Sequence, residues 1–453
     1  MRPSSACAVT LRIVLVRHGL SSFNVEHRIQ GRDDLSSLTV EGEQQARLTG
    51  EALRDLRFDA AYTSPLRRAS ATASTLLEAQ GQGLTATTSD DLLEIDLAPW
   101  SGLLRSELKE RHPEQERLWR EAPETLTLER DGASYSPIGE LMEQAGRFKA
   151  QLLREYGESL AATDRTVLVV GHNAILRCLL LSLLDLPASG FRRLRVDNCS
   201  VSVLNLSHGP DGGIAVQVES LNGTAHLGDP LPARGKGPRL VLVRHGETDW
   251  NRQGRFQGQI DIPLNANGRA QAEAAGRFLA PVSFHRAYSS SMARPRQTAE
   301  AILASHPGVP LTTTRGLVEI GHGLWEGRLE SEIAEGWPQL LADWKRAPES
   351  VQMPEGETIH DVWDRSLATW HTIARSLGVE ETALVVAHDA VNKTILCALL
   401  GLTAADIWAI KQGNGGVTVI DYPNGAEAGP VVSAMNLTTH LGGVLDRTAA
   451  GAL

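Results

Sequence analysis

Short apolar runs alternate with segments of helical periodicity along most of the chain. The runs at 11–16 and 239–243 are rich in β-branched residues, and each leads into a glycine-containing turn. Such a run is typical of a central strand that is buried on both faces. The same pattern predicts further strands at 58–64, 166–172, 284–290 and 383–388, and helices at 39–56, 67–80, 265–280 and 294–306. A helix is also expected after each of the strands 166–172 and 383–388. This alternation predicts a three-layer α/β fold, with a mostly parallel central sheet covered by helices on both faces.

The pattern occurs twice along the chain. LRIVLVRHG, which contains His18, returns as RLVLVRHG, which contains His245, and four further segments recur in the same order. Their matched residues are Arg68 and Arg294, Glu94 and Glu319, His172 and His388, and Asn222 and Asn436. Five collinear matches indicate a duplicated domain. We expect domains at 11–228 and 239–445, and an exposed linker at 229–238 that is rich in Pro, Gly and charged residues. The Gly/Ala-rich tail is expected to fray.

Composition narrows the class of protein and of partner. The 453 residues are 42% hydrophobic and 22% charged, as in ordinary globular proteins, and the net charge of −10 argues against nucleic acid as a partner. No apolar run reaches the roughly 18 residues that cross a bilayer, so we expect no membrane partner. Cys7, Cys178, Cys199 and Cys397 form no C-x-x-C pair and are expected to be reduced thiols. We therefore expect a cytoplasmic protein, with a short organelle-targeting extension in the first ten residues as the alternative.

Both R-H-G motifs and both later histidines follow predicted strands. Ligand sites of parallel sheets lie at the carboxyl ends of the strands. We therefore expect one active site in each copy, with His18 and His172 in the first and His245 and His388 in the second.

The segments LVRHGLSSFN and LVRHGETDWN resemble the histidine phosphatase superfamily, also called phosphoglycerate mutase-like. In both copies an Arg, a Glu and then a Gly-His or Ala-His after another strand follow in the order of that family. The resemblance covers nearly the whole chain and implies two tandem domains with the phosphoglycerate mutase-like fold. The tandem layout is similar to that of cyanobacterial proteins of the 2-carboxy-D-arabinitol-1-phosphatase type.

These residue types suit phosphoryl transfer through a phosphohistidine. Arginines offer forked N–H groups to a phosphate dianion, and the second histidine of each copy completes the clamp. The first histidine is the expected nucleophile, because a neutral imidazole attacks near pH 7. The glutamate would protonate the leaving alkoxide and later activate water, which requires a raised pKa. The expected catalytic residues are His18, Glu94, His172, His245, Glu319 and His388, and the expected phosphate-binding residues are Arg17, Asn24, Arg68, Arg244, Asn251 and Arg294.

Several residues have a structural alternative. Arg17 and Arg244 could merely satisfy carbonyl groups at the strand ends, and Asn24 and Asn251 could hold the turn instead of touching phosphate. The other residues weighed and kept out of the site are Arg67 as a solvated helix charge, His27, His112 and His322 as surface or structural residues, His226 and His440 as parts of a closing strand, and Trp100 and Trp325 as pocket or core residues.

The two copies differ around this shared set. The second matches the family more closely, because Glu247 follows its R-H-G and Glu326 closes its acid segment, where the first copy has Leu20 and Ser101. The first copy is longer after the acid, where family members carry a cap over the substrate. Residues expected to contact the organic part of a substrate there are Lys109, Arg111, Trp119 and Arg120 in the first copy and Trp337, Trp344, Lys345 and Arg346 in the second.

The sequence therefore favours a phosphatase that hydrolyses small phosphorylated metabolites, with 2-carboxy-D-arabinitol 1-phosphate as one candidate substrate. The chain has neither an Asp cluster for magnesium nor a G-x-x-x-x-G-K-[ST] loop, so we expect no metal and no cofactor. Phosphoglycerate mutase activity is the alternative enzymatic reading. A regulatory or scaffolding protein that binds phosphate ligands without turnover is another, and one copy alone could have decayed to that state. The sequence leaves a homo-oligomer open.

Overall fold

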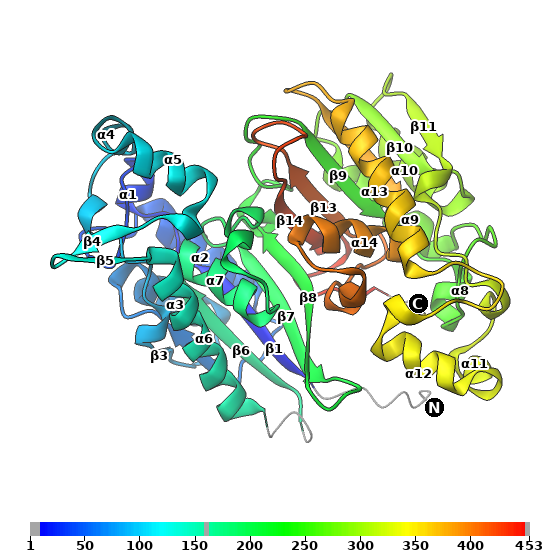
Figure 1. Ribbon diagram of the computed structural model, residues 1–453, viewed down its shortest axis with the longest axis horizontal. Coiled ribbons are helices and arrows are strands. Elements are labelled where there is room, and N and C mark those ends of the chain that lie inside the picture. The colour runs from blue at the N-terminus through cyan, green and yellow to red at the C-terminus, as the bar shows by residue number, and fades with distance from the viewer. Residues whose placement is uncertain (1–9, 158–162, 449–453) are drawn as a thin grey trace. The chain divides into compact units, whose positions relative to one another are not determined.

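The computed structural model describes residues 10–157 and 163–448, which form two compact units (Figure 1). Unit 1 holds the residues up to His208 together with Ile214–Val216 and Asn222–Asp229. Unit 2 holds Gly209–Gly213, Gln217–Leu221 and the residues from Pro230 on. Cys7, the candidate targeting extension and the end of the Gly/Ala-rich tail lie outside the described residues. Within the described ranges, no helix is both long and apolar enough to cross a bilayer.

Unit 1 is built on a sheet with the strand order β7-β1-β6-β2-β3. Its elements are β1 (Leu11–Arg17), α1 (Ser22–Val25), α2 (Val40–Ala52), β2 (Ala60–Thr63), α3 (Arg67–Gln80), β3 (Thr87–Thr88), α4 (Arg105–Arg111), α5 (Pro113–Glu121), β4 (Leu128–Arg130), β5 (Ala133–Tyr135), α6 (Pro137–Tyr156), β6 (Arg165–Gly171), α7 (Asn173–Leu183) and β7 (Val201–His208), followed by β8 (Ile214–Gly223), whose residues are divided between the units. β1 pairs in parallel with β6 and antiparallel with β7. β2 continues the sheet in parallel with both β6 and β3.

Unit 2 repeats this plan with the strand order β11-β10-β12-β9-β13-β14. Its elements are β9 (Arg239–Arg244), α8 (Asp249–Gln253), α9 (Ala266–Leu279), β10 (Arg286–Ser290), α10 (Ala293–Leu303), β11 (Leu311–Thr314), α11 (Glu330–Gly336), α12 (Pro338–Arg346), α13 (Ile359–Arg375), β12 (Thr382–Ala387), α14 (Asp389–Leu400), β13 (Val417–Asp421) and β14 (Val431–Leu437). β9, β12, β10 and β11 are parallel, whereas β13 runs antiparallel to β9 and to β14.

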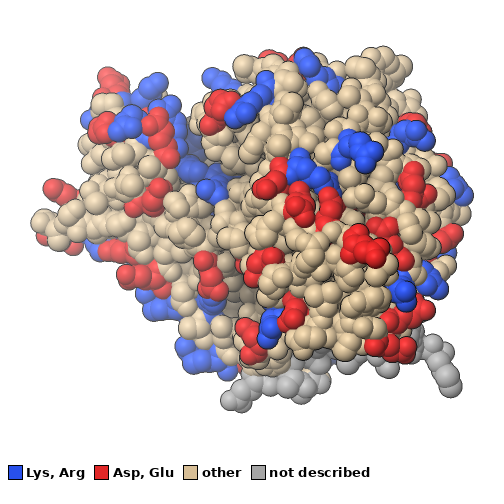
Figure 2. Space-filling model, turned by 45° about the vertical axis from the view of Figure 1, so that its right-hand side comes forward, with Lys and Arg blue, Asp and Glu red and all other residues tan. Residues whose placement is uncertain are grey.

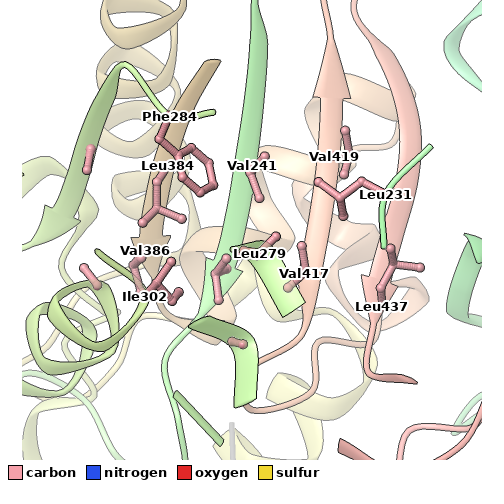
Figure 3. Packing of buried hydrophobic residues seen from close by; sticks show 14 of the residues in the cluster. Leu231, Val241, Leu279, Phe284, Ile302, Leu384, Val386, Val417, Val419 and Leu437 are labelled. Atoms are coloured by element: carbon pink, nitrogen blue, oxygen red, sulfur yellow. The ribbon is translucent and has the colours of Figure 1, made fainter. Parts of the chain in front are cut away.

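The expected α/β fold with a mostly parallel sheet is confirmed, and unit 2 shows how its layers pack. Val241 and Val243 of β9 pack with residues of α9 and α10, including Leu279 and Ile302, in one buried cluster (Figure 3). Alternate residues of a strand point to opposite faces, so the equally buried Leu240 and Leu242 face the other layer. A strand that is apolar on both faces is therefore the physical origin of the LVLV pattern.

Backbone packing fixes the loop that follows the first strand of each unit. A Cβ atom at Gly42 would lie 2.1 Å from the carbonyl oxygen of Leu20, and one at Gly268 would lie 2.0 Å from that of Glu247. Glycine is required at these helix positions because the R-H-G loop rests directly on the backbone of α2 or α9. The helix therefore fixes the position of the R-H-G loop.

The segment 229–238 differs in part from the exposed linker that its composition suggests. Residues 233–236 are exposed, but Leu231 is buried in the core cluster of unit 2. The carbonyl oxygen of Pro232 accepts a hydrogen bond of 2.9 Å from Arg239, which itself forms a buried ion pair with Asp421. The segment is therefore anchored because one apolar side chain and one carbonyl group are used by the second unit.

We expect Gly268→Ala to lower the stability of unit 2 by about 1–3 kcal/mol, because the added methyl group must displace backbone atoms. Denaturant unfolding followed by tryptophan fluorescence measures this effect. Asn267→Ala, at an exposed neighbouring position of α9, is the matched control. Equal stability of the two variants would contradict the packing argument.

Candidate active site

The structure brings the first and second histidines of each copy together at the carboxyl end of the sheet. His18 follows β1 and His172 precedes α7, and their ring centroids are 5.1 Å apart. The corresponding rings of His245 and His388 are 5.2 Å apart. The backbone N–H of His18 donates to the carbonyl group of Gly171 at 2.9 Å, which extends the β1–β6 ladder into the site.

A carbonyl group fixes the tautomer of the first histidine in each copy. Nδ1 of His18 lies 2.8 Å from the carbonyl oxygen of Gly19, and Nδ1 of His245 lies 2.7 Å from that of Gly246. A carbonyl oxygen only accepts, so Nδ1 carries the proton and Nε2 is unprotonated with its lone pair directed into the site. The ring is thereby prepared to react at Nε2.

Burial keeps all four histidines neutral. It lowers the pKa of His18 and of His172 well below the usual 6.5, and the neighbouring guanidiniums of Arg17 and Arg68 lower both further. Burial likewise lowers the pKa of His245 and His388 in the second copy, with Arg294 as the next cause. The site therefore combines fixed positive charge from arginine with neutral imidazoles.

The arginines after the β2 and β10 strands are fully buried and held by carbonyl groups of a surface loop. Arg68 donates to the carbonyls of Gly31 and Asp33 at 2.8 and 3.1 Å. Arg294 makes the corresponding bonds and also directs Nε to Nε2 of His245 at 3.2 Å. Nε of Arg68 has no hydrogen-bond partner among the described residues. A phosphate oxygen between guanidinium and imidazole would satisfy such donors.

Arg17 and Arg244 combine the two roles that the sequence left open. Nη1 of Arg17 donates to the carbonyl of Val196 at 2.9 Å, and Nη1 of Arg244 donates to that of Gln412 at 2.5 Å. Each therefore satisfies a carbonyl group beyond its strand. Nε of both side chains is buried without a partner among the described residues, which leaves a donor for a ligand.

Asn24 and Asn251 use their side-chain oxygens to hold the turn. Oδ1 of Asn24 accepts from the hydroxyl of Ser21 at 2.9 Å, and Oδ1 of Asn251 accepts from the backbone N–H of Thr248 at 3.1 Å. These bonds cap α1 and α8. Holding the turn therefore uses the side-chain oxygen of Asn24 and of Asn251. A contact of either side chain with phosphate stays a prediction.

The two glutamates lie at helix N-termini beside the second histidine. Oε1 of Glu94 accepts from the backbone N–H of Ala174 at 3.2 Å, and Oε2 of Glu319 accepts from that of Asp389 at 3.1 Å. Burial raises the pKa of Glu319, and the carboxylate of Asp389 raises it further. Asn173 occupies the position of Asp389 in the first copy, so this second negative charge is absent there.

Sequence reasoning missed two pairs of residues that hold the histidine loop. Thr72 and Thr298 accept from the backbone N–H of Gly19 and Gly246 at 3.0 and 3.1 Å. Nδ2 of Asn198 donates to the carbonyl of His18 at 2.9 Å, and Asn414 makes the same bond to His245 at 3.1 Å. The signal was present, because both pairs recur at matching places in the two copies.

Residues kept out of the site prove structural, with one correction. Arg67 forms an exposed ion pair with Asp34, His27 and His112 are exposed, and Trp100, Trp325 and His322 are fully buried. Core packing therefore explains both tryptophans. The prediction that His226 and His440 belong to a closing strand is wrong, since each lies in a 3₁₀ turn after the strand. Nε2 of each histidine hydrogen-bonds a carbonyl group there.

Glu247 and Glu326, which have no counterpart in the first copy, hold loops around the second site and are not among its expected reacting groups. Glu247 bonds Arg252 and Asn265, while Glu326 accepts from the backbone of Gln259 and Ile260 at 2.8 and 2.9 Å. Glu326 thus fixes the loop whose carbonyls hold Arg294. In the first copy the hydroxyl of Ser101 bonds the side chain of Asp33, a different solution for the same loop.

The extra length of the first copy is spread over three places. The segment with the hairpin β4–β5, residues 122–136, is three residues longer than its counterpart 347–358, in which Gln352 and Thr358 form a single antiparallel bridge. α6 is three residues longer than α13, and the segment between α6 and His172 is three residues longer than that between α13 and His388.

We call α4 and α5 of the first copy, and α11 and α12 of the second, the cap helices. The charged residues expected to contact substrate lie on the outer surface of these helices. Arg111, Arg120, Lys345 and Arg346 pair with Glu107, Glu121, Glu330 and Asp343, and Lys109 is exposed. Trp119 and Trp337 are half-buried, and Trp344 is fully buried. In both caps, therefore, the tryptophans are the buried or half-buried side chains and the charged side chains face outward.

Neither a disulfide nor a cluster of metal-ligand side chains occurs among the described residues. Cys178, Cys199 and Cys397 are unpaired and buried. Among residues 10–157 and 163–448, no three His, Cys, Asp or Glu side chains are grouped as metal ligands would be. The site instead joins two imidazoles, two guanidiniums and one carboxyl group in each copy.

Comparison with known proteins agrees with this geometry. The family model "Histidine phosphatase superfamily (branch 1)" matches residues 13–215 and 240–437. A 2-carboxy-D-arabinitol-1-phosphatase of Triticum aestivum is 30% identical over 465 residues, which cover 97% of this chain and 88% of that protein. Phosphoserine phosphatase 1 of Hydrogenobacter thermophilus is 31% identical over 204 residues, or 45% of this chain and 94% of that protein. A 2,3-bisphosphoglycerate-dependent phosphoglycerate mutase of Brucella ovis is 36% identical over 191 residues, or 40% of this chain and 90% of that protein. The family model covers most of both halves: the chain belongs to the histidine phosphatase superfamily, branch 1, as a tandem two-domain member, and it is a phosphoric monoester hydrolase.

Proposed function

We propose that the protein hydrolyses small phosphorylated metabolites without a metal ion, through a phosphohistidine formed on His18 in domain 1 and on His245 in domain 2. The observation that carries the proposal is the neutral imidazole whose Nδ1 is bound by a carbonyl group and whose Nε2 lies beside buried guanidinium groups. Such a ring is a nucleophile in a field that favours a phosphate dianion.

The first half-reaction transfers the phosphoryl group to the histidine. Nε2 attacks phosphorus as the bond to the ester oxygen breaks, and the departing oxygen takes a proton from Glu94 or Glu319. The arginines bind the equatorial oxygens throughout, since charge develops there. The products of this step are the free alcohol, a phosphohistidine and a glutamate carboxylate.

The second half-reaction restores the enzyme. The carboxylate takes a proton from a water molecule as the oxygen of that water attacks phosphorus and the P–N bond breaks. Inorganic phosphate leaves, and the imidazole and the carboxylic acid are regenerated. The raised pKa of Glu319 supports this role, because the group must carry a proton before the first step and release it during that step.

The name of the wheat relative makes 2-carboxy-D-arabinitol 1-phosphate the first substrate to assay. That relative supports the choice because its match extends over both domains. The mutase relative at 36% identity supports phosphoglycerate mutase activity as the second candidate. Isomerisation of 3-phosphoglycerate that depends on the bisphosphate primer would favour the mutase, whereas release of inorganic phosphate without primer favours hydrolysis. Ligand binding without either reaction would favour a non-catalytic binding protein.

We expect hydrolysis of p-nitrophenyl phosphate to survive EDTA and to fall by about 10³-fold or more in His18→Ala/His245→Ala, because the phosphoryl acceptor is lost. His245→Ala should cost more than His18→Ala, since Asp389 adds a carboxylate beside Glu319 where the first copy has Asn173. Steady-state rates and rapid-quench trapping of acid-labile ³²P on the protein measure both points. His112→Ala, at an exposed histidine, is the control. Loss of activity in EDTA would contradict metal independence, and equal or reversed losses would contradict the ranking of the domains.

We expect Asp389→Asn, measured in the full chain with His18→Ala, to move the alkaline limb of kcat/KM to lower pH. Asp389 helps hold the pKa of Glu319 up, so its removal lowers that pKa and the acid form is lost at a lower pH. The pH profile of phosphate release from glycerol 3-phosphate, whose departing alkoxide needs a proton, measures the shift. Asn173→Asp in the His245→Ala chain is the matched control and should move the limb of domain 1 upward. An unchanged limb in Asp389→Asn would contradict Glu319 as the acid.

A further inference from the structure

We propose that domain 1 has a second anion subsite, formed by Arg177 and Arg192 beside its phosphate clamp. Domain 1 accordingly takes phosphate monoesters that carry a second anionic group, either a carboxylate or another phosphate, and domain 2 lacks this subsite. The inference rests on the proposed function, because it takes the clamp of Arg17 and Arg68 as the place of the first phosphate.

Arg177 lies one helical turn behind the phosphate clamp. Nδ2 of Asn173, the first residue of α7, donates to the carbonyl of Val196 at 2.8 Å, and Nη1 of Arg17 donates to the same oxygen at 2.9 Å. Side chains four residues apart share a helix face, about 5–6 Å from one another. Arg177 therefore follows Asn173 on the face of α7 that meets Arg17. That spacing suits two anionic groups on one small molecule.

An aromatic platform holds the two guanidiniums near each other. Cζ of Arg177 is 5.1 Å from the ring centroid of Phe191, and Cζ of Arg192 is 5.8 Å from the same centroid. Arg192 also lies 5.0 Å over the ring of Trp119 and donates to its backbone carbonyl. The two arginines thus connect α7, which carries Arg177, with α5 of the cap, which Arg192 contacts.

No carboxylate forms an ion pair with either of these two charges in the described part of the chain. Asp197 and Glu94 act on Arg177 without pairing with it, as Glu124 and Glu116 do on Arg192. Neither Arg177 nor Arg192 has an ion pair there, and Nε of each is buried without a hydrogen-bond partner. Burial lowers the pKa of Arg177 to about 9 and that of Arg192 to about 10, and each is lowered further by another arginine. Burying like charges without a counterion is unfavourable, so a bound anion is the natural compensation. By contrast, the surface of unit 1 over α4 and α5 carries side chains of both charges, which form ion pairs with one another (Figure 2).

Domain 2 makes the same structural contacts with its charge neutralised. Lys393, at the place of Arg177 in α14, pairs with Asp389 at 3.0 Å and lies over the ring of Trp408. Trp408 stands at the place of Arg192, and its Nε1 donates to the carbonyl of Trp344 at 3.2 Å, as Arg192 donates to that of Trp119. A neutral indole therefore suffices for the contact with the cap. The charge of Arg192 serves some other purpose, which we assign to the ligand.

Matched substrates test the subsite in the full chain carrying His245→Ala, in which only domain 1 turns over. Glycerol 3-phosphate and 3-phosphoglycerate differ by a carboxylate, and fructose 6-phosphate and fructose 1,6-bisphosphate differ by a phosphate. We expect kcat/KM to favour the more anionic member of at least one pair by about tenfold or more, since charged hydrogen bonds contribute on that scale. The pair with the larger ratio identifies the second group. No preference in either pair would overturn the proposal.

Exchange variants separate charge from packing. Arg192→Trp installs the residue of domain 2 and retains a donor for the cap carbonyl, so the preference should fall about tenfold and chiefly through KM. Trp408→Arg in the His18→Ala chain should raise the preference of domain 2. Arg117→Ala, which removes an exposed charge of α5 in the same cap, should leave the ratio unchanged. A ratio that Arg192→Trp does not alter, or that Arg117→Ala alters equally, would overturn the assignment to Arg192.

A binding measurement distinguishes this inference from the proposed function. Calorimetric titration of His18→Ala/His245→Ala with glycerol 3-phosphate and 3-phosphoglycerate needs no turnover. Tighter binding of the carboxylate that Arg192→Trp removes supports the subsite even if the wild-type protein hydrolyses neither ester. Hydrolysis of both esters without any difference in binding or rate overturns the subsite and leaves the phosphatase proposal standing.

Discussion

The hydrogen bond from Nδ1 of His18 or His245 to the carbonyl of the next residue is the constraint on which each site depends. It fixes which nitrogen carries the proton, and burial beside arginine keeps the ring from taking a second one. The carbonyl is in turn fixed, because the following backbone lies against a glycine of α2 or α9 with no room for a side chain. Reactivity at Nε2 is thus determined by backbone geometry, and the side chains around it then decide what can approach.

The two copies keep this arrangement and vary what surrounds it. In domain 2, Arg294 contacts Nε2 of His245, and Asp389 adds negative charge beside Glu319. Domain 1 has Asn173 at that place, and Arg192 stands where domain 2 has Trp408. Duplication has therefore preserved the core of the proposed chemistry while the charges beside it have changed. Two active centres on one chain with different partners for the organic group are the simplest interpretation of this pattern.

The sequence predicted the parts of the fold that depend on local patterns or on repetition. Apolar β-branched runs located β1, β6, β9 and β12, and recurrence in both copies located the histidines, arginines and glutamates. Asn198 and Thr72 were missed because a single asparagine or threonine carries no periodic signal, although each recurs. The cap helices and the hairpin β4–β5 were not predicted in detail, since they are short and bury few side chains. Arg177 and Arg192 stood out only once the structure showed that no carboxylate pairs with them among the described residues.

The position of β1 between two hydrogen-bonded neighbours determines which parts of domain 1 can unfold locally. The strand that carries His18 is buried along nearly its whole length, whereas α5 in the cap buries none of its residues. Local opening costs least where few apolar contacts are lost. The strand that carries His18 is therefore the costly part of the domain to open, and α5 is the easy part. The imidazole of His18 is thus held on a rigid support, whatever the loosely packed helix does.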